Sequence, residues 1–170
     1  GNNNPVYVEY CSGNGDWLIE KALENPDINW VAVEKKFERV RKIWSKKHNN
    51  NLDNIIIICG EAQCTTSNYF PKQSISKTFI NFPDPWPKRK HHKHRLCNKK
   101  FFSLLCTILK NEGTINFVTD HEGYRDYAIA AALDTANLSS KLAEPFFVKL
   151  EENYGDSFFQ SLWKRQGFNN

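Results

Sequence analysis

The chain has 170 residues, of which 40% are hydrophobic, 14% aromatic and 25% charged; this is the composition of a folded globular domain and excludes a disordered or low-complexity protein. Its apolar runs are shorter than the roughly 20 residues that a membrane-spanning helix needs, and no signal peptide opens it. The net charge of +4 is modest, so the placement of charge along the chain is more informative than its sum.

Five cysteines, at positions 11, 59, 64, 97 and 106, make an odd number without a Cys-x-x-Cys pair. This spacing predicts neither a disulfide framework nor a zinc site, so we expect reduced thiols, no metal and a cytoplasmic location. The whole chain, residues 1–170, is expected to form a single domain. Its polar start, residues 1–4, is compatible with a truncated N-terminal extension, a tag remnant or a simple lead-in.

The first predicted unit is a strand, a glycine turn and a helix. Residues 5–10 alternate β-branched and aromatic side chains, the turn follows at residues 11–16, and residues 17–23 have a helical pattern. In α/β proteins this layout brings backbone amides and a helix N-terminus to a ligand. A turn that only reverses the chain is the alternative.

The second predicted unit is a strand at residues 29–34 and a helix at residues 37–47. The strand ends in Glu34, about twenty residues beyond the glycine turn, where a Rossmann-like fold places a carboxylate that accepts hydrogen bonds from ribose hydroxyls. The helix is expected to bury Phe37, Val40, Ile43 and Trp44 on one face. Its many basic residues are expected to form a solvated face rather than a second RNA site.

A third strand is predicted at residues 54–59, which form a β-branched run typical of a buried strand. Glu61 comes directly after it, where a carboxylate could receive an adenine amino group. A plain polar end to the strand is the alternative. Residues 63–76 form a polar connection with room for a short helix.

A short strand is predicted at residues 77–82, and the stretch at residues 81–95 begins with the last residues of this strand and continues as a loop. Prolines at positions 83, 85 and 87 fix its backbone and remove amide donors around Asp84 and Trp86. Every residue at positions 88–95 is Lys, Arg or His. A rigid carboxylate beside a polycation indicates a site for a polyanion. A solvated basic loop is the alternative, but such a loop does not need a tryptophan and three prolines.

The rest of the chain continues the alternation of helices and strands. The predicted elements are a helix (96–109), a turn (111–113), a strand (114–119), a helix (124–136), and two strands (145–150 and 157–164) that a turn at 154–156 joins into an antiparallel pair.

This alternation predicts a parallel α/β sheet that binds its ligands above the carboxyl ends of the strands. Glu9, Glu34 and Glu61 lie at or just beyond the ends of the first three strands, and Asp120 follows the fifth. No Gly-x-x-x-x-Gly-Lys-[Ser/Thr] phosphate loop is present. Repeated carboxylates would repel a triphosphate but suit a positively charged ligand.

Residues 82–96 read Phe-Pro-Asp-Pro-Trp-Pro-Lys-Arg-Lys-His-His-Lys-His-Arg-Leu, and they resemble the signature loop of the bacterial tRNA (guanine-N7-)-methyltransferase family. The resemblance implies a Rossmann-like class I methyltransferase with a mostly parallel seven-stranded sheet, an antiparallel closing strand and helices on both faces. It implies methyl transfer from S-adenosylmethionine to N7 of guanine 46 in the variable loop of tRNA. No obligatory protein partner is expected, and the protein would be a monomer or a homodimer.

The chain departs from the family pattern at three places. The family shows Glu-x-Gly-x-Gly-x-Gly where this chain has Cys11 in place of the first glycine. It shows Gly-Asp-Ala where this chain has Gly60-Glu61-Ala62. It shows Thr-x-x-Glu where this chain has Ser157 and Gln160, so the negative charge at the last position is lost.

The resemblance also implies roles for individual residues. Asp84 is the expected catalytic residue, which would hold the N1–H and amino edge of the guanine or contact the methionine part of the donor. Trp86 is expected to brace the loop rather than stack on the base. The other implied contacts are with the cofactor (Glu9, Gly13, Gly15, Glu34, Glu61 and Asp84), the substrate nucleotide (Lys88, Asp120, Ser157 and Gln160) and RNA phosphates (Arg89, Lys90, His91, His92, Lys93 and Arg95).

Two other functions stay open at this point. One is a methyltransferase of the same fold that acts on another RNA or on a small molecule, although the basic tract argues against a small neutral substrate. The other is a non-catalytic RNA-binding module. Cofactor binding separates the second from an enzyme, because a module without turnover need not retain a cofactor.

Overall fold

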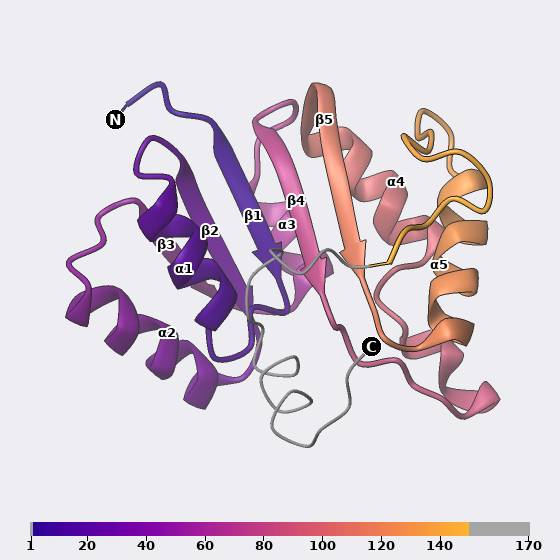
Figure 1. Ribbon diagram of the computed structural model, residues 1–170, viewed down its shortest axis with the longest axis horizontal. Coiled ribbons are helices and arrows are strands. Elements are labelled where there is room, and N and C mark those ends of the chain that lie inside the picture. Colours follow the sequence, from indigo (N-terminus) through magenta and orange to yellow (C-terminus); the bar gives the residue numbers. More distant parts are fainter. Residues whose placement is uncertain (1, 150–170) are drawn as a thin grey trace.

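The computed structural model describes residues 2–149. Within them, five parallel strands form one sheet in the order β3-β2-β1-β4-β5, with helices packed on both faces (Figure 1). The strands are β1 (Val6–Tyr10), β2 (Asn29–Glu34), β3 (Ile55–Cys59), β4 (Ile75–Asn81) and β5 (Leu109–Val118). The helices are α1 (Asp16–Glu24), α2 (Phe37–Asn49), α3 (Ala62–Tyr69), α4 (Lys99–Ile108), α5 (Glu122–Leu133) and the short 3-10 helix η1 (Arg89–His94).

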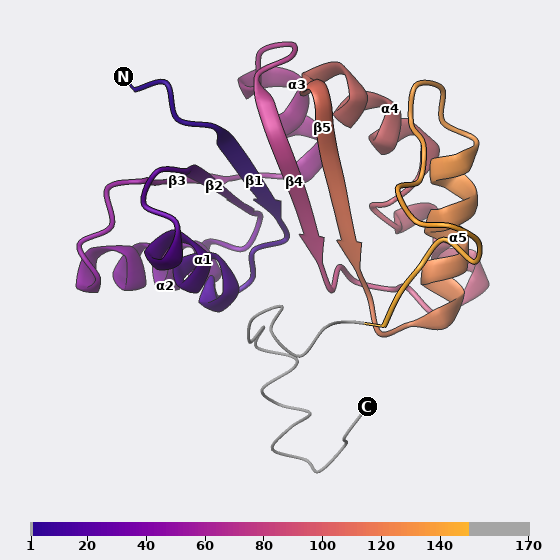
Figure 2. The same cartoon turned by 45° about the horizontal axis from the view of Figure 1, so that its top comes forward.

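The two faces of the sheet carry separate apolar cores, because successive residues of a strand point to opposite faces. Val8 and Tyr10 of β1 pack with side chains of α4 and α5, such as Phe101 and Tyr124. On the other face, Trp30 and Ala32 of β2 pack with the apolar side of α1 and with Ile43 of α2. Figure 2 shows α1 and α2 on one side of the sheet and α3 and α4 on the other. The predicted parallel α/β sheet with helices on both faces is confirmed for the described residues.

The predicted third strand is present, but it is not buried throughout. β3 pairs only with β2 among residues 2–149, so it is an edge strand of the described sheet. Ile55 is buried, whereas Ile56 on the opposite face is 61% exposed. A β-branched run therefore predicted the strand correctly and its burial wrongly, because burial depends on what covers each face.

Helix α2 also buries less than its pattern predicted. Ile43 is its one buried residue. Phe37 and Trp44 are 62% and 59% exposed, and the indole of Trp44 stacks on His48 with the ring centroids 5.4 Å apart. The helix packs beside the edge of the described sheet, where Ile43 alone is buried against the neighbouring elements and the two aromatic side chains face outward.

Helix α4 begins at Lys99, three residues later than predicted. Asn98 is its N-cap, and the side-chain oxygen of Asn98 accepts a hydrogen bond from the Phe101 amide at 3.1 Å. The preceding Cys97 amide donates to the hydroxyl of Tyr124 instead of a helical carbonyl. The predicted turn at residues 111–113 lies within the irregular part of β5, where the pairing passes from Ile75–Leu109 to Lys77–Thr114.

The predicted seven-stranded sheet with an antiparallel closing strand does not appear in residues 2–149, where the sheet has five strands and all of them are parallel. Residues 145–149 are not a strand. Instead the amide of Phe146 donates to the carbonyl of Ala143 at 2.7 Å, and Phe146 has a φ of 68°, so the chain turns where a strand was predicted. The predicted strand at 157–164 lies outside the described residues. None of the described helices has the length and apolar character that a membrane crossing requires.

Candidate active site

The candidate site lies at the carboxyl ends of β1 and β4, the two central neighbours of the sheet. The connection from β1 runs through α1 on one face, whereas the connection from β4 runs through η1 and α4 toward the other. The loops after β1 and β4 therefore diverge to opposite faces of the sheet (Figure 1). Open α/β sheets bind their ligands at such a switch point.

A buried carboxyl group forms the floor of this region. Glu9 is 2% exposed, and its Oε1 accepts a hydrogen bond of 2.9 Å from the side-chain amide of Asn81, the last residue of β4. Its Oε2 has no hydrogen-bond partner among residues 2–149. Burial raises the pKa of Glu9 to about 8, against the lowering effect of the hydrogen bond from Asn81. Near neutral pH the carboxyl group is therefore mostly protonated in the free protein, and the hydrogen-bonding capacity of Oε2 is not used within residues 2–149.

The raised pKa of Glu9 makes the free protein less stable as the pH rises. The native state keeps a proton up to a pKa of about 8, whereas the unfolded chain loses it near 4.5, so the free energy of unfolding falls between these values. The loss is about 1.4 kcal/mol per pH unit at most, or a few kcal/mol in total. We expect the Glu9→Gln variant, which cannot ionise, to lose this dependence in urea unfolding at pH 5, 6.5 and 8. Glu38→Gln, an exposed control on α2, should keep the pH dependence of wild type. If the free energy of unfolding fell equally with pH in wild type and in Glu9→Gln, Glu9 would not be its source.

The turn after β1 has three residues in the left-handed region, Cys11 (φ 60°), Gly13 (φ 56°) and Gly15 (φ 79°). A Cβ on Gly15 would lie 2.8 Å from Cγ1 of Ile43, so α1 and α2 can approach only over a glycine. A Cβ on Gly13 would meet only the Cys11 carbonyl, at 3.9 Å. The backbone at Gly13 is thus open to the close approach of a ligand.

The carboxylate of Glu34 joins this turn to the end of β2. One oxygen accepts the Gly13 amide and the other accepts the Lys36 amide, both at 2.9 Å. Arg39 lies 3.8 Å away and adds a positive charge. The side chain is buried, so its first effect is to fix the shape of the turn. Carboxylate oxygens have further lone pairs, and these are the groups that ribose hydroxyls would use.

Cys11 stands where the family that the chain resembles has glycine, and the positive φ of Cys11 explains why glycine is preferred there. Burial raises the pKa of its thiol to about 12, with further contributions from Glu34, Asp84 and Glu9. The thiol is therefore neutral and not a nucleophile. The carboxyl groups that contribute to this shift come from β1, from the end of β2 and from the loop after β4.

Replacing Cys11 with glycine is expected to stabilise the protein. Relief of the left-handed strain exceeds the entropic cost of glycine by about 0.5–1 kcal/mol. The free energy of unfolding in urea measures this gain. As a matched control, Cys106→Gly in the middle of α4 should destabilise by about 1 kcal/mol, because its backbone is helical. Destabilisation by both changes would show that the positive φ of Cys11 does not lower the stability of the protein.

The proline loop brings Asp84 to the same edge. Asp84 is exposed. Phe82 and the buried end of β4 precede it in the chain, and Trp86 follows it. The indole of Trp86 packs on His94 and His91, with centroid distances of 5.1 and 5.8 Å. Trp86 therefore contacts its own basic segment, in keeping with a bracing role.

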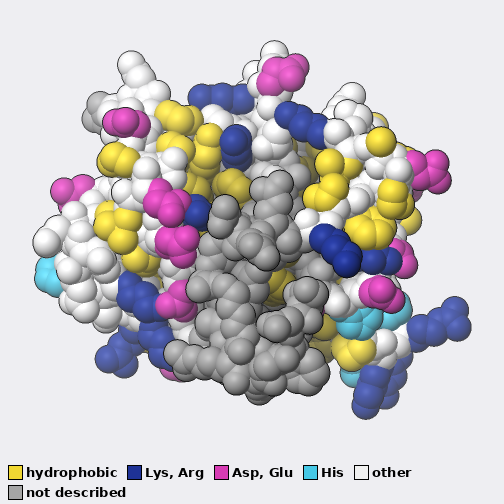
Figure 3. Space-filling model, viewed as in Figure 1, with side chains coloured by type: hydrophobic (Ala, Val, Ile, Leu, Met, Phe, Trp, Pro, Cys, Tyr) yellow, Lys and Arg dark blue, Asp and Glu magenta, His cyan; other side chains and the backbone are white. Residues whose placement is uncertain are grey.

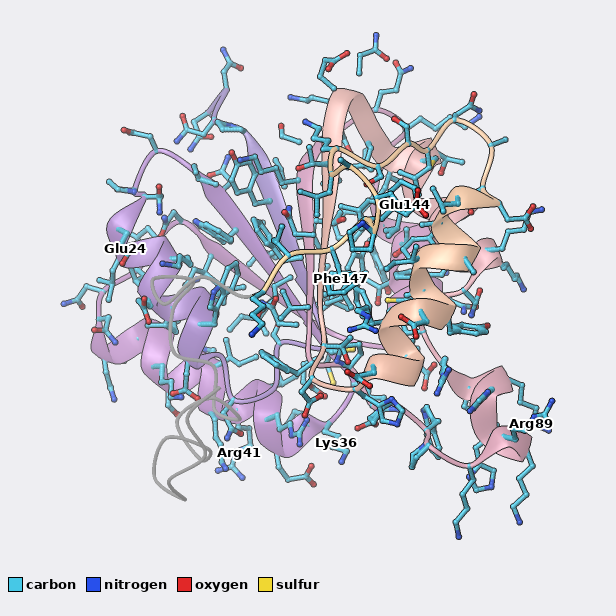
Figure 4. All side chains as sticks on the ribbon, turned by 45° about the vertical axis from the view of Figure 1, so that its right-hand side comes forward. Glu24, Lys36, Arg41, Arg89, Glu144 and Phe147 are labelled. Carbon is cyan, nitrogen blue, oxygen red and sulfur yellow. The ribbon has the colours of Figure 1, made fainter. Side chains whose placement is uncertain are left out.

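The basic tract forms η1 and divides into exposed and inward-facing residues. The exposed cations are Lys88, Arg89, Lys90 and Lys93. Dark blue side chains project at this corner beside the cyan histidines in Figure 3, and Arg89 points away from the body in Figure 4. His91 packs on Trp86, and His92 is half-buried near Tyr127, with centroids 6.4 Å apart.

Arg95 does not share the exposure of the tract. Its side chain is 2% exposed, and its guanidinium donates to the carbonyls of Pro85 and Gly123. A buried guanidinium cannot reach a phosphate at the surface, so the structure separates Arg95 from the other expected phosphate contacts. Sequence reasoning had no signal for this, because Arg95 closes an unbroken run of basic residues.

The remaining expected residues lie at or near the same edge. Glu61 is exposed and is the N-cap residue of α3, without a side-chain cap hydrogen bond. Asp120 is exposed between β5 and α5. Ser157 and Gln160 lie outside the described residues. Asn81 was missed; its signal is its place in the strand next to Glu9, which can be recognised only once the strand order is known.

Comparison with known proteins identifies relatives over nearly the whole chain. Residues 3–151 match the family model Methyltransf_4, described as "Putative methyltransferase". The tRNA (guanine-N(7)-)-methyltransferase of Chlamydia abortus is 47% identical over 167 residues, which cover 98% of this chain and 74% of that protein. The enzyme of the same name from Chlamydia muridarum is 45% identical over 98% of this chain and 73% of its own length.

Solved structures show the same fold at low sequence identity. Precorrin-6y C5,15-methyltransferase from Geobacter metallireducens superposes with a TM-score of 0.63 at 15% identity, covering 77% of this chain and 61% of that one. Geranyl diphosphate C-methyltransferase from Streptomyces coelicolor, solved with S-adenosyl-L-homocysteine, has a TM-score of 0.56 at 13% identity and covers 70% and 41%. The sheet and its helices therefore form a Rossmann-like class I methyltransferase fold.

Proposed function

The chain belongs to the tRNA (guanine-N(7)-)-methyltransferase family, and we propose that it methylates N7 of guanine 46 in the variable loop of tRNA at the carboxyl edge of β1 and β4. These relatives are named for methyl transfer to guanine N7 in tRNA. The cofactor is S-adenosylmethionine, in agreement with the family and with the S-adenosyl-L-homocysteine in a structure of the same fold. The position in the tRNA and the role of each residue are the proposed part.

The residues around Glu9 fit this cofactor. It carries a sulfonium and an ammonium, and the described edge offers one buried carboxyl group with an unpartnered oxygen and a second carboxylate, Glu34. The open backbone at Gly13 allows close approach. Glu9, Gly13, Gly15, Glu34 and Glu61 would hold the cofactor, which when bound supplies a methyl group activated by the sulfonium charge.

The protein's own contribution is mainly to position the guanine. N7 carries an in-plane lone pair and is unprotonated at neutral pH, so no strong base is needed. Good alignment and exclusion of water supply roughly 7–11 kcal/mol in favourable cases. Asp84 would hold the guanine through its N1–H and amino group, or contact the methionine part of the donor. Lys88 and Asp120 would position the nucleotide.

One observation carries the proposal. The Asn81 amide at the end of β4 donates to Glu9 at the end of β1, at 2.9 Å, and the Asp84 loop begins directly after Asn81. The expected cofactor side and the expected substrate side are therefore joined by one buried hydrogen bond. Burial of both partners makes this link rigid.

The exposed cations of the basic tract would bind the tRNA backbone. Lys88, Arg89, Lys90 and Lys93 are all exposed at one corner. Contacts to phosphates fix the position of the RNA without reading its sequence. His91 and His92, which pack against aromatic rings, would contribute less, and Arg95 is buried away from the surface.

Transfer of labelled methyl groups from S-adenosylmethionine to tRNA, followed by nucleoside analysis, tests the function. We expect label in 7-methylguanosine. Label in another nucleoside would place the chain among methyltransferases with a different target. Cofactor binding without any labelled nucleoside, or no cofactor binding, would overturn the proposal in favour of an RNA-binding module.

A further inference from the structure

Arg95 belongs by sequence to the RNA-binding tract but by structure to the interior. We propose that it is a positioning residue that locks the loop after β4 to the loop after β5; its catalytic consequence rests on the proposed function of those loops. Asp84 lies in the first loop, and Asp120 lies in the second. One guanidinium would therefore fix the relative places of both substrate-binding carboxylates.

The first contact of Arg95 is with the proline loop. Its Nε donates to the carbonyl of Pro85 at 2.8 Å, one residue after Asp84. The loop contains two strained residues, Phe82 with φ 48° and Trp86 with φ 45°. Residues in this region persist only where their surroundings hold them. Because the three prolines have no amide hydrogens, the loop can form few hydrogen bonds of its own, and the bond from Arg95 replaces them.

The second contact of Arg95 is with the start of α5. Its Nη1 donates to the carbonyl of Gly123 at 3.0 Å. The guanidinium also lies 5.0 Å from the ring centre of Tyr124 and 5.1 Å from that of Tyr127. The hydroxyl of Tyr124 accepts the amide of Cys97, which pins the chain just after Arg95. Helix α5 begins two residues after Asp120, so this contact sets the place of that carboxylate.

The way in which this charge is buried argues for a geometric role. No ion pair with a carboxylate joins Arg95 within residues 2–149. Two carbonyls and two aromatic rings offset the cost of removing the guanidinium from water. A buried charge is a weak source of stability compared with a well-packed apolar side chain. The rigid fork of an arginine, with donors at fixed angles, instead links two carbonyls in one geometry.

Two measurements on Arg95→Lys test the proposal, with Arg41→Lys on the exposed face of α2 as the matched control (Figure 4). Lysine keeps the charge but cannot donate to both carbonyls in the same geometry. Hydrogen–deuterium exchange of the free protein should rise about tenfold or more in both loops, at residues 82–88 and 119–123, with α1 and β1 unchanged. Arg41→Lys should leave both loops unchanged. Faster exchange in neither loop, in one loop only, or across the whole protein would overturn the proposal.

The kinetic measurement separates positioning from a loss of folded protein. With rates normalised to cofactor-binding sites, kcat of Arg95→Lys should fall about 10–100-fold, because small misplacements cost up to about 10²-fold. KM for tRNA should change less than about threefold. In an Asp84→Asn background the same change should cost less than about threefold, because the effect passes through Asp84. A higher KM with unchanged kcat, or the full loss in both backgrounds, would overturn the proposal. Absence of activity in wild type would contradict the proposed function, and the exchange result would still decide the link between the loops.

Discussion

Asp84→Ala is expected to lower the rate of methyl transfer to tRNA by about 10²–10³-fold or more, while tRNA retention on a filter stays within about threefold of wild type. The reason is the position of this side chain: it is exposed beyond the carboxyl end of β4, and its charge contributes to the raised pKa of Cys11 in the turn after β1. Single-turnover rates with saturating tRNA and cofactor measure the effect.

Asp53→Ala is the matched control for this change. Asp53 is also an exposed carboxylate, but it lies just before β3, at the opposite edge of the sheet. Its loss should leave the rate unchanged within a factor of about two, since surface changes of this kind have small effects. A variant at Asp84 with a wild-type rate would remove this residue from the catalytic role.

The second large effect is expected from the exposed cations of η1. Changing Arg89, Lys90 and Lys93 together to glutamine should weaken tRNA binding about 10²-fold at moderate salt, and it should reduce the slope of log affinity against log salt by about 2–3. At saturating tRNA the rate should remain close to wild type, because these residues are proposed to contact the RNA backbone and not the reacting guanine. Filter binding over a salt series measures both quantities.

A matched triple change on α2 separates a specific RNA surface from a general effect of charge. Arg41, Lys42 and Lys47 are also exposed or half-buried cations, and glutamine at these positions removes the same net charge. Their salt slope should stay near that of wild type, in agreement with a solvated face. A larger loss from the α2 variant than from the η1 variant would move the tRNA surface to α2.

The strands and the carboxylates at their ends could be predicted because both are local features. The strand predicted at residues 29–34 has the bounds of β2, and Glu9 and Glu34 end buried strands as expected. A parallel sheet then brings strand ends to one edge whatever the order of the strands. The position of a residue along its own strand was therefore enough to predict that most of the candidate site residues lie at the same edge of the sheet.

Features that depend on neighbours in space could not be predicted in the same way. Nothing local distinguishes Ile56, which is exposed, from Ile55, which is buried; the difference arises from the edge position of β3. Arg95 reads as one more cation of a basic run until its partners at Pro85 and Gly123 are known. Asn81 acquires a role only from the strand beside it.

Methyl transfer to two transcripts of the same tRNA tests the central claim most directly. One transcript carries guanine at position 46, and the other carries 7-deazaguanine there, which keeps the N1–H and amino edge but has carbon in place of N7. We expect labelled methyl to enter the first transcript alone, with the second competing for binding at a similar concentration. Equal incorporation into both transcripts would contradict N7 of guanine 46 as the target of this site.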